Sequence, residues 1–592
     1  MTSFTLLSSS STARTLAANE TGFVALGSTL YTSTGDSVTV TGSASVTAMG
    51  SIVADGGNAL DMSSATDFLW LTLGQEGALS ASRSQAITGF TNNQLILNNS
   101  GLISGGAEAI SLSAQVQAGV VADYHIANSG TIQSSGFSTT ENTIEFTMPT
   151  SGIVNLGNTG LILNGGAGGA ILIVGGRLDM TNSGTIQCRS TFNAITSDLG
   201  NDVIDNSGTI IGGISLNDGN DTLSNQGRIT GNLFLGNGSD RVVNTGTILG
   251  VVNLSDVLTT GAINDTVVNY GLISGDVLLG NGNDTYRSRG GQVDGTVFGG
   301  AGDDLYIVDQ ADLAISDSNG NDTVRASVDF ALSFGMDRLE FVGPGGRIGT
   351  GNTDANTIVG GVGDDLLRGA GGADMLFDGG GAGNDTLAGG DGDDVLISNN
   401  GDDVIEGGGG FDTLTLSSGA VILGWTVNLG SASAVQDGVR SLVVRGIERV
   451  EGDFGNDTMT GNALANHLSG GFGADRLNGG GGDDTLVGGG FADALNGGAG
   501  ADVFRFETFG DSSVIETDRI SDFVTGVDHI ELPKGDYVFL GTGAFTGAAD
   551  EIRFVVAGGV TTIEVRLLGA SVNAMEIELT GNVALTASDF VF

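Results

Sequence analysis

The stretch that decides the fold is Gly452–Arg505, which divides without a gap or an insertion into six nonapeptides. They read GDFGNDTMT, GNALANHLS, GGFGADRLN, GGGGDDTLV, GGGFADALN and GGAGADVFR. Each begins with glycine and carries an aspartate at its sixth position, except that Asn466 replaces it once, and a large apolar residue follows two places later. This period predicts a repeat in which every nonapeptide contributes one turn and one short strand.

The residue types within the nonapeptide point to a metal site. Glycines permit positive-φ turns, so two turn carbonyls can point inward beside the aspartate carboxylate. The last three residues, such as 485–487, predict a very short strand, and two nonapeptides would form one coil. Stacked coils would bring half-sites together around a hard cation, and oxygen-only ligands select calcium over zinc or copper. A flexible linker is disfavoured because it has no reason to keep an apolar residue at every eighth position.

This pattern resembles the GGxGxDxUx repeat of the RTX (repeats-in-toxin) family. The resemblance implies a right-handed parallel β-roll with Ca²⁺ in the turns, ligated by the carbonyls at positions two and four and by the carboxylate at position six. Carried over to this sequence, the ligand residues are Gly300, Gly302, Asp304, Asp322, Gly361, Gly363, Asp365, Gly372, Asp374, Gly381, Gly383, Asp385, Gly390, Gly392, Asp394, Gly401, Asp403, Gly408, Gly410, Asp412, Gly455, Asp457, Gly471, Gly473, Asp475, Gly480, Gly482, Asp484, Gly489, Asp493, Gly498, Gly500 and Asp502.

A second repeat, NxGxI, occurs upstream and begins at residues 99, 128, 158, 182, 206, 225, 244 and 269. Where the repeats are shortest, each carries three strand-like pieces, as in a three-sided parallel β-helix. The asparagines Asn206, Asn225, Asn244 and Asn269 should stack as a ladder that pairs amides between coils. This region resembles the β-helical passenger repeats of surface autotransporters.

The two repeats merge, because each of these coils ends in a nonapeptide fragment such as LNDGNDTL at 216. Successive coils would align Asp221, Asp240 and Asp284 along one edge and offer calcium a single row of sites. The alternative is that these aspartates only cap turns by bonding backbone amides. Both interpretations stay open, because the fragments lack the glycine at position one.

We therefore predict an all-β chain, a long right-handed parallel β-solenoid in which a β-helix is followed by an RTX β-roll. The predicted division is an amino-terminal cap with irregular coils (1–98), the β-helix (99–290), a first β-roll (291–415) with an insertion at 326–349, a β insertion (416–451), a second β-roll (452–505) and a carboxyl-terminal β-rich secretion domain (506–592).

The amino-acid composition limits the classes of molecule that the chain can bind. The 68 acidic and 21 basic residues give a net charge of −47, so nucleic acid and anionic membranes are poor partners and divalent cations are good ones. Self-repulsion of this size should expand the metal-free chain and couple folding to calcium binding. Cys188 is the only cysteine, which leaves no partner for an intramolecular disulfide. No apolar run approaches the roughly 18 residues of a membrane helix.

We expect the protein to be located outside the cell, at the bacterial cell surface. The first 20 residues lack the basic and apolar regions of a Sec-type signal peptide. DRISDFVTGVDHIEL at 518 resembles the domain after the β-roll in serralysin-type RTX proteins. The chain ends with Asp589 followed by three apolar residues, which resembles an uncleaved type I secretion signal. The alternative is an ordinary final edge strand.

Catalytic signatures are sparse. HExxH and GxSxG are absent, and His467 and His529 suit turn or surface roles. His125 lies beside Asp123 and Tyr124, residue types that β-helical polysaccharide lyases and epimerases with RTX tails use, but no basic residue is near it in sequence.

We expect a protein that is not an enzyme: a secreted, calcium-binding structural protein of surface-layer or matrix/adhesin type. Its partners would be calcium, the type I secretion apparatus, and either further copies of itself or a cell-surface polysaccharide. The alternative is a β-helical polysaccharide lyase or epimerase with an RTX tail. A grouped acidic, histidine and arginine cleft around His125 would favour the enzyme, and a flat Thr/Asn surface would favour assembly.

Overall fold

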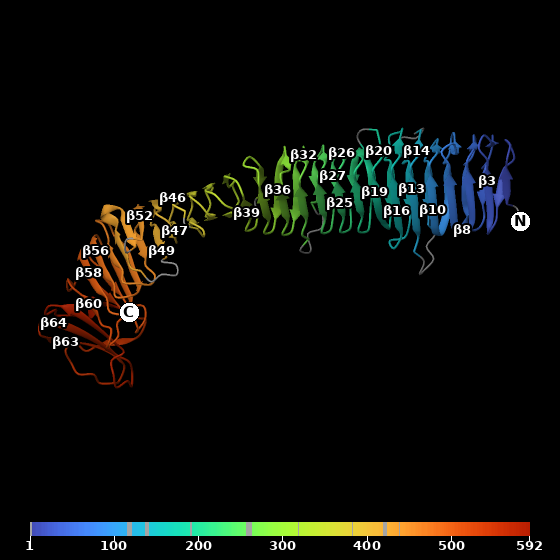
Figure 1. Cartoon of the computed structure of the whole chain (residues 1–592). Coiled ribbons are helices and arrows are strands. Elements are labelled where there is room, and N and C mark those ends of the chain that lie inside the picture. Colours follow the sequence, from blue (N-terminus) through green and yellow to red (C-terminus); the bar gives the residue numbers. More distant parts are fainter. Residues whose placement is uncertain are drawn as a thin grey trace. The chain divides into compact units, whose positions relative to one another are not determined.

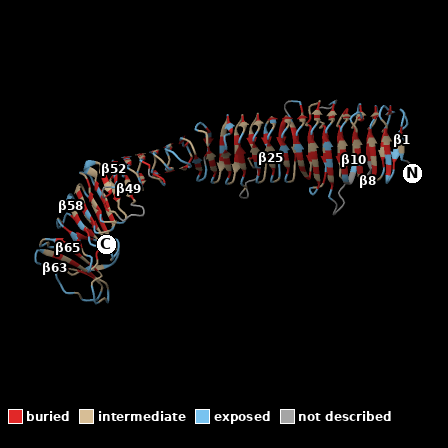
Figure 2. Cartoon of the chain, in the orientation of Figure 1, coloured by how far each residue is buried: buried red, intermediate tan, exposed pale blue. Residues whose placement is uncertain are grey.

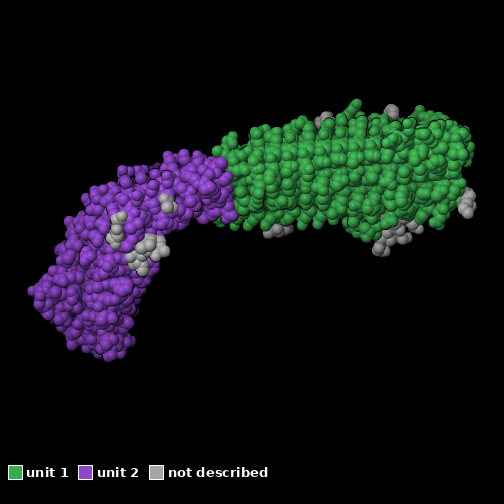
Figure 3. Space-filling model, in the orientation of Figure 1, with its two compact units in different colours: residues 1–322 green, residues 323–592 purple. Residues whose placement is uncertain are grey.

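A computed structural model describes residues 3–114, 121–135, 141–189, 192–255, 263–317, 319–381, 383–417, 423–436 and 439–592. Within these ranges the regular elements are β-strands and two three-residue 3-10 helices. Most strands pair in parallel with the strand one coil later, as Figure 1 shows. The predicted all-β parallel solenoid is therefore confirmed. The chain forms two compact units, Met1–Asp322 and Thr323–Phe592 (Figure 3).

Coils of the first unit have three strands. One coil contains β22 (Val203–Asn206), β23 (Thr209–Ile211) and β24 (Gly213–Ser215), and the next contains β25 (Thr222–Asn225), β26 (Arg228–Thr230) and β27 (Leu233–Phe234). Their registers align Ile204 with Leu223, Ile210 with Ile229 and Ile214 with Leu233. The three-sided coil expected from the NxGxI spacing is thus present.

Strands of successive coils already pair in parallel near the amino terminus. β3 (Glu20–Val24) pairs with β6 (Ala44–Ala48), and β6 pairs with β8 (Leu60–Leu73), in parallel register each time. The first 98 residues, which we expected to form a cap and irregular coils, therefore contain stacked coils as well.

The core lies inside the coils, where alternate strand positions are buried (Figure 2). In β25, Leu223 and Asn225 are buried, while Thr222 and Ser224 are half-buried. Period-two alternation directs one set of side chains inward, and each buried aliphatic side chain contributes about 1.5–3 kcal/mol.

The buried asparagines form the predicted ladder. Each Nδ2 donates to the Oδ1 of the asparagine one coil later at 2.7–2.9 Å, through Asn99, Asn128, Asn158, Asn182, Asn206, Asn225, Asn244 and Asn269. The ladder satisfies amides that would otherwise be buried without partners.

In the second unit each nonapeptide supplies one strand. One sheet of the first roll contains β44 (Leu366–Gly371), β46 (Thr386–Asp391) and β48 (Val404–Gly409). The other sheet contains β45 (Met375–Phe377), β47 (Val395–Ser398) and β49 (Thr413–Leu416). The second roll repeats this with β55 (His467–Phe472) and β57 (Thr485–Gly490), and with β56 (Arg476–Gly481) and β58 (Ala494–Ala499).

The segment 416–451 contains an antiparallel meander. β50 (Trp425–Asn428), β51 (Ser433–Gln436) and β52 (Arg440–Arg445) pair antiparallel. β52 also pairs in parallel with β48, and β50 with β54 (Thr458–Thr460), so the meander joins the two rolls in one sheet. The segment 326–349 keeps parallel pairing, since β41 (Arg338–Phe341) pairs with β39 (Thr323–Ala326).

The carboxyl-terminal region extends the solenoid. β63 (Asp550–Ala557), β64 (Val560–Arg566) and β65 (Met575–Thr580) are antiparallel, and β65 pairs with β60 (Asp518–Ile520). The last strand, β66 (Phe590–Val591), pairs in parallel with β61 (His529–Glu531). A final strand therefore exists, and the secretion signal stays a prediction. None of the helices in the described ranges has the length and apolarity to cross a membrane.

Candidate metal centres and a polar groove

A single row of aspartates runs along the carboxyl-terminal part of the first unit, from Asp202 to Asp322. In each coil the backbone N–H of one aspartate donates to the Oδ1 of the aspartate one coil later, at 2.6–2.8 Å. The row comprises Asp202, Asp221, Asp240, Asp265, Asp284, Asp304 and Asp322. It brings together the three aspartates predicted from the nonapeptide fragments and adds Asp202 and Asp265. The signal for those two is an Asn-Asp pair directly before an apolar strand.

Each roll carries two such rows, one on each edge. The same hydrogen bond links successive coils at 2.7–3.1 Å. In the first roll the rows are Asp365, Asp385 and Asp403, and Asn356, Asp374, Asp394 and Asp412; in the second they are Asp457, Asp475, Asp493 and Asp518, and Asn466, Asp484, Asp502 and Asp528. The position-six residues predicted from the sequence are therefore aligned, and Asp518 and Asp528 continue the rows beyond residue 505.

The second carboxylate oxygen explains the glycine at position one. In the nonapeptide 470–478, a Cβ on Gly470 would collide with the Oδ2 of Asp475. The same collision recurs between Gly479 and Asp484. Position one must therefore be glycine wherever the position-six carboxylate turns back over its own turn.

Several of these second oxygens are fully enclosed and have no hydrogen-bond partner, namely the Oδ2 atoms of Asp202, Asp221, Asp374, Asp394, Asp412, Asp475, Asp484, Asp493 and Asp518. An unsatisfied buried oxygen costs roughly 1–3 kcal/mol, so a repeated set requires an external partner. Carboxylate and carbonyl oxygens are the ligands that Ca²⁺ prefers, and the donor set fits that ion.

Burial also makes the rows resist ionisation. It raises the pKa of Asp221 to about 7 and, together with the neighbouring Asp475 carboxylate, the pKa of Asp493 to about 8. Burial and the Asp493 carboxylate raise the pKa of Asp518 to about 9. A divalent cation would offset this cost, because an adjacent positive charge favours the carboxylate form.

One predicted half-site already contains a cation from the protein. Arg440, at the start of β52, donates through Nη1 to the carbonyl of Asn399 (2.6 Å) and through Nε to that of Gly401 (2.9 Å). Its Nη2 lies 3.3 Å from the Oδ2 of Asp403. These are the position-two and position-four carbonyls and the position-six carboxylate of the nonapeptide 398–406. Gly401 and Asp403, predicted as calcium ligands, therefore bind a guanidinium, and the calcium assignment for this half-site needs correction.

The face around His125 is a groove of about 460 Å³. The parallel register places His125 of β13 (Asp123–Asn128) beside Asn155 of β16 (Ile153–Asn158), and Asn155 beside Asp179 of β19 (Arg177–Asn182). His125 Nε2 lies 3.1 Å from an Asp123 carboxylate oxygen, and Asn155 Nδ2 donates to Asp123 Oδ1 at 3.1 Å.

A basic residue reaches this face from two coils away. Arg177 aligns with Ile153, which aligns with Asp123, and its guanidinium lies 2.7 Å from Asp179. The sequence offered no basic residue near His125, because Arg177 is 52 positions later in the chain and only the coil register brings it close.

His467, in contrast, lies in β55, where burial and nearby arginines lower its pKa to about 4 and keep it neutral.

Comparison with known proteins identifies the repeats. The family model of the RTX calcium-binding nonapeptide repeat matches residues 350–377, 379–414, 451–486, 460–495 and 478–511. No curated protein matches the sequence.

Two solved structures are similar over part of the chain. The AlgE6R3 subunit of the Azotobacter vinelandii mannuronan C5-epimerase is 31% identical, with 23% of this chain and 78% of that chain covered and a TM-score of 0.20. The AlgE6R2 subunit is also 31% identical, with 22% and 88% covered and a TM-score of 0.17. The expectation of a protein that is not an enzyme is contradicted, because these similar subunits belong to an enzyme.

The matched repeats and the aligned aspartate rows coincide in the rolls of the second unit. This chain therefore carries RTX calcium-binding nonapeptide repeats in a parallel β-solenoid.

Proposed function

We propose that this chain is an exported protein of the bacterial cell surface or its matrix, whose solenoid becomes rigid on binding Ca²⁺ and then assembles through its outer faces. The observation that supports this most is the set of enclosed Oδ2 atoms in the aspartate rows. The proposed ligands are the position-six aspartates with the carbonyls at positions two and four, except at the half-site that contains Arg440. Bound Ca²⁺ would also offset the net charge of −47.

The proposed export route is type I secretion, with the secretion signal at the carboxyl-terminal end of the chain. The RTX repeats support export, because such repeats are typical of secreted proteins. Low cytoplasmic calcium would keep the chain expanded during export, and extracellular calcium would fold it afterwards.

An aromatic row supports self-association. Phe454, Phe472 and Phe491 are exposed on the second roll and line an apolar groove, and the rings of Phe454 and Phe472 stack with centroids 5.4 Å apart. Phe491 has a φ of 80°, a conformation that costs a non-glycine residue roughly 1–3 kcal/mol. Burial of this row against a second copy would remove apolar surface from water.

Electron microscopy of the full chain with added Ca²⁺ tests the assembly. We expect ordered sheets or filaments that disappear in Phe472→Ser, while the circular dichroism of that variant stays unchanged. Dispersed single particles at saturating calcium would contradict the proposal.

The groove around His125 favours a second candidate, a polysaccharide-active site. A histidine, two carboxylates and an arginine lie on one face of three successive coils, which is the grouping that acid–base chemistry on a uronate chain requires. We expect uronate polysaccharides to be cleaved or epimerised by the calcium-loaded chain and not by His125→Ala. Product formation that is equal in both would exclude this groove as the site.

A further inference from the structure

We infer that Asp304, Asp317 and Asp322 form a calcium site of a second kind, in which three side-chain carboxylates hold the ion. It lies at the carboxyl end of the first unit and differs from the repeat pattern in its donors. It deepens the calcium role proposed above and depends on that proposal only for the identity of the cation.

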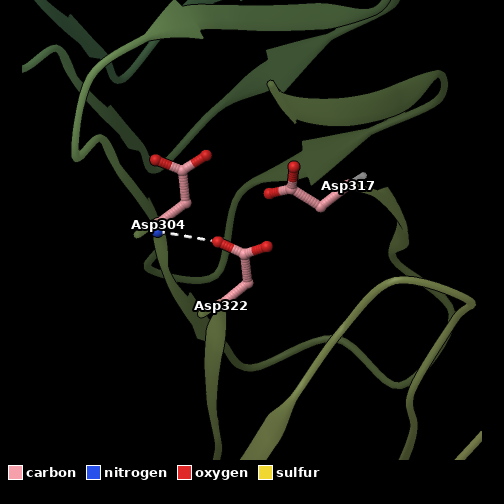
Figure 4. A group of neighbouring side chains, drawn as sticks. All are labelled: Asp304, Asp317 and Asp322. Carbon is pink, nitrogen blue, oxygen red and sulfur yellow. Dashed lines mark hydrogen bonds between the residues drawn. The ribbon is translucent and has the colours of Figure 1, made fainter. Parts of the chain in front are cut away.

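The three carboxylates come from consecutive short segments. Asp304 directly precedes β37 (Leu305–Val308), Asp317 directly follows β38 (Ala314–Ser316) and Asp322 directly precedes β39. One oxygen of each carboxylate lies within 4.8 Å of the others, and all three residues are buried. Figure 4 shows the three side chains turned toward a common space.

One enclosed oxygen points into this space without a partner. Asp304 is 2% exposed, and its Oδ2 has no hydrogen bond. A Cβ placed on Gly299 would collide at once with this Oδ2, with Asp317 Oδ2 and with the hydroxyl of Tyr306. These three oxygens therefore surround a single point that only a glycine leaves free.

Asp317 makes this site different from the others. It occupies the first position of the nonapeptide DSNGNDTVR, where the repeat has glycine. The Gly300 N–H donates to its Oδ1 (3.1 Å) and the Tyr306 hydroxyl to its Oδ2 (2.5 Å), which orients the carboxylate toward Asp304. The Asp304 N–H donates to Asp322 Oδ1 (2.8 Å) and orients the third.

The chemistry favours a hard divalent cation. Three buried carboxylates repel one another strongly at low dielectric, and a bound cation removes this repulsion. Calcium affinity rises with the number of charged ligands and with the rigidity of the site. With three oriented carboxylates, this site should bind Ca²⁺ before the rows, where each nonapeptide supplies one.

Calcium titration of the full chain, with ion binding followed by calorimetry, tests the inference. The test variant is Asp317→Asn, and the matched control is Asp312→Asn, which removes the same charge from an exposed residue five positions earlier. We expect Asp317→Asn to weaken the tightest ion at least tenfold and to leave the weaker ions unchanged, while Asp312→Asn behaves as the parent chain. Equal titrations of both variants and the parent would overturn the site.

Terbium provides a second readout, because Tyr306 lies at the site and can sensitise bound Tb³⁺. We expect tyrosine-excited Tb³⁺ emission at the first equivalent to be lost in Asp317→Asn and kept in Asp312→Asn. If Asp317→Asn does not fold, Asp317→Gly, which restores the repeat residue, replaces it, and unaltered emission in that variant would overturn the site. A third outcome separates the two proposals. If Asp317→Asn loses the tight ion but the parent chain folds equally with and without calcium, the site is supported and calcium-coupled folding is refuted.

Discussion

The guanidinium of Arg440 lies 3.3 Å from the carboxylate of Asp403, and both side chains are buried, with 7% and 0% exposed. The same guanidinium has only hydrogen-bond donors and donates to the two turn carbonyls of that nonapeptide. Arg440 is 37 residues later in the chain, and the antiparallel meander brings it to this edge of the first roll. The arginine therefore supplies a fixed positive charge where the repeat otherwise offers its oxygens to calcium.

Replacing this arginine should convert the half-site into a calcium site. At the lowest free Ca²⁺ that keeps the parent chain folded, Arg440→Ala leaves the Asp403 carboxylate buried without its cationic partner, which costs roughly 3–5 kcal/mol of unfolding free energy. In saturating Ca²⁺ we expect much of this loss to be recovered and one more ion to be bound, as measured by denaturant unfolding and calorimetry.

Arg445 is the control, because its ion pair with Glu406 (2.8 Å) is exposed. Arg445→Ala should change stability by at most about 1 kcal/mol and leave the ion count unchanged. A calcium count that is the same in Arg440→Ala as in the parent chain would refute the substitution of arginine for calcium.

The asparagine ladder should stabilise the first unit. Asn225→Ala removes the acceptor of Asn206 Nδ2 and the donor to Asn244 Oδ1, and leaves both amides buried. We expect a loss of about 1–3 kcal/mol in urea unfolding at saturating calcium. The exposed neighbour Gln226, changed to alanine, should stay within about 0.5 kcal/mol. Equal midpoints for the two variants would show that the ladder contributes nothing.

Most of the fold was predictable from local repeats. The eighth-position apolar residues predicted the strands of the rolls, and the NxGxI spacing predicted the ladder, because both patterns recur at every coil. The aspartates at 202 and 265 were missed, because only an Asn-Asp pair before an apolar strand marks them, which is a shorter signal than the fragment LNDGNDTL at 216.

Contacts between distant residues were not predictable. Arg177 meets the His125 face only through the register of three strands. Arg440 reaches Asp403 only because β52 pairs with β48. Asp317 departs from the repeat at a single position. Its proposed role as a calcium ligand follows only from the carboxylates of Asp304 and Asp322 that the coils bring close to it.

The calcium-free protein should lose stability as pH rises. The pKa values of Asp221, Asp493 and Asp518 lie at about 7, 8 and 9 in the folded chain, above the ordinary 3.8, because burial disfavours the charged form. The folded state therefore keeps protons that the unfolded chain releases, and its stability falls between about pH 4 and pH 9.

Thermal unfolding in chelator measures the effect from about pH 4 upward, as far as the calcium-free chain still shows a folding transition. Calcium should reverse it, since Ca²⁺ binds the deprotonated carboxylates and its contribution grows with pH. A melting temperature of the chelated protein that rises with pH would contradict the role of these buried carboxyls.

Deleting 587–592 should keep the chain in the cytoplasm of a host with a type I system. The deletion also removes β66, which pairs with β61. The purified truncated chain therefore needs a calcium titration by circular dichroism, to separate a lost signal from a lost fold. Normal export of a truncated chain would show that the address lies elsewhere.

Far-UV circular dichroism of the full chain against free Ca²⁺ tests the central claim most directly, with Mg²⁺ at equal ionic strength as the control for charge screening. Because the rows place buried carboxylate oxygens without partners in both units, we predict that chelation collapses the β signal. The signal should return between roughly micromolar and millimolar free Ca²⁺, the range of sensor and extracellular sites. A β spectrum that is the same with and without calcium would contradict a calcium-dependent fold.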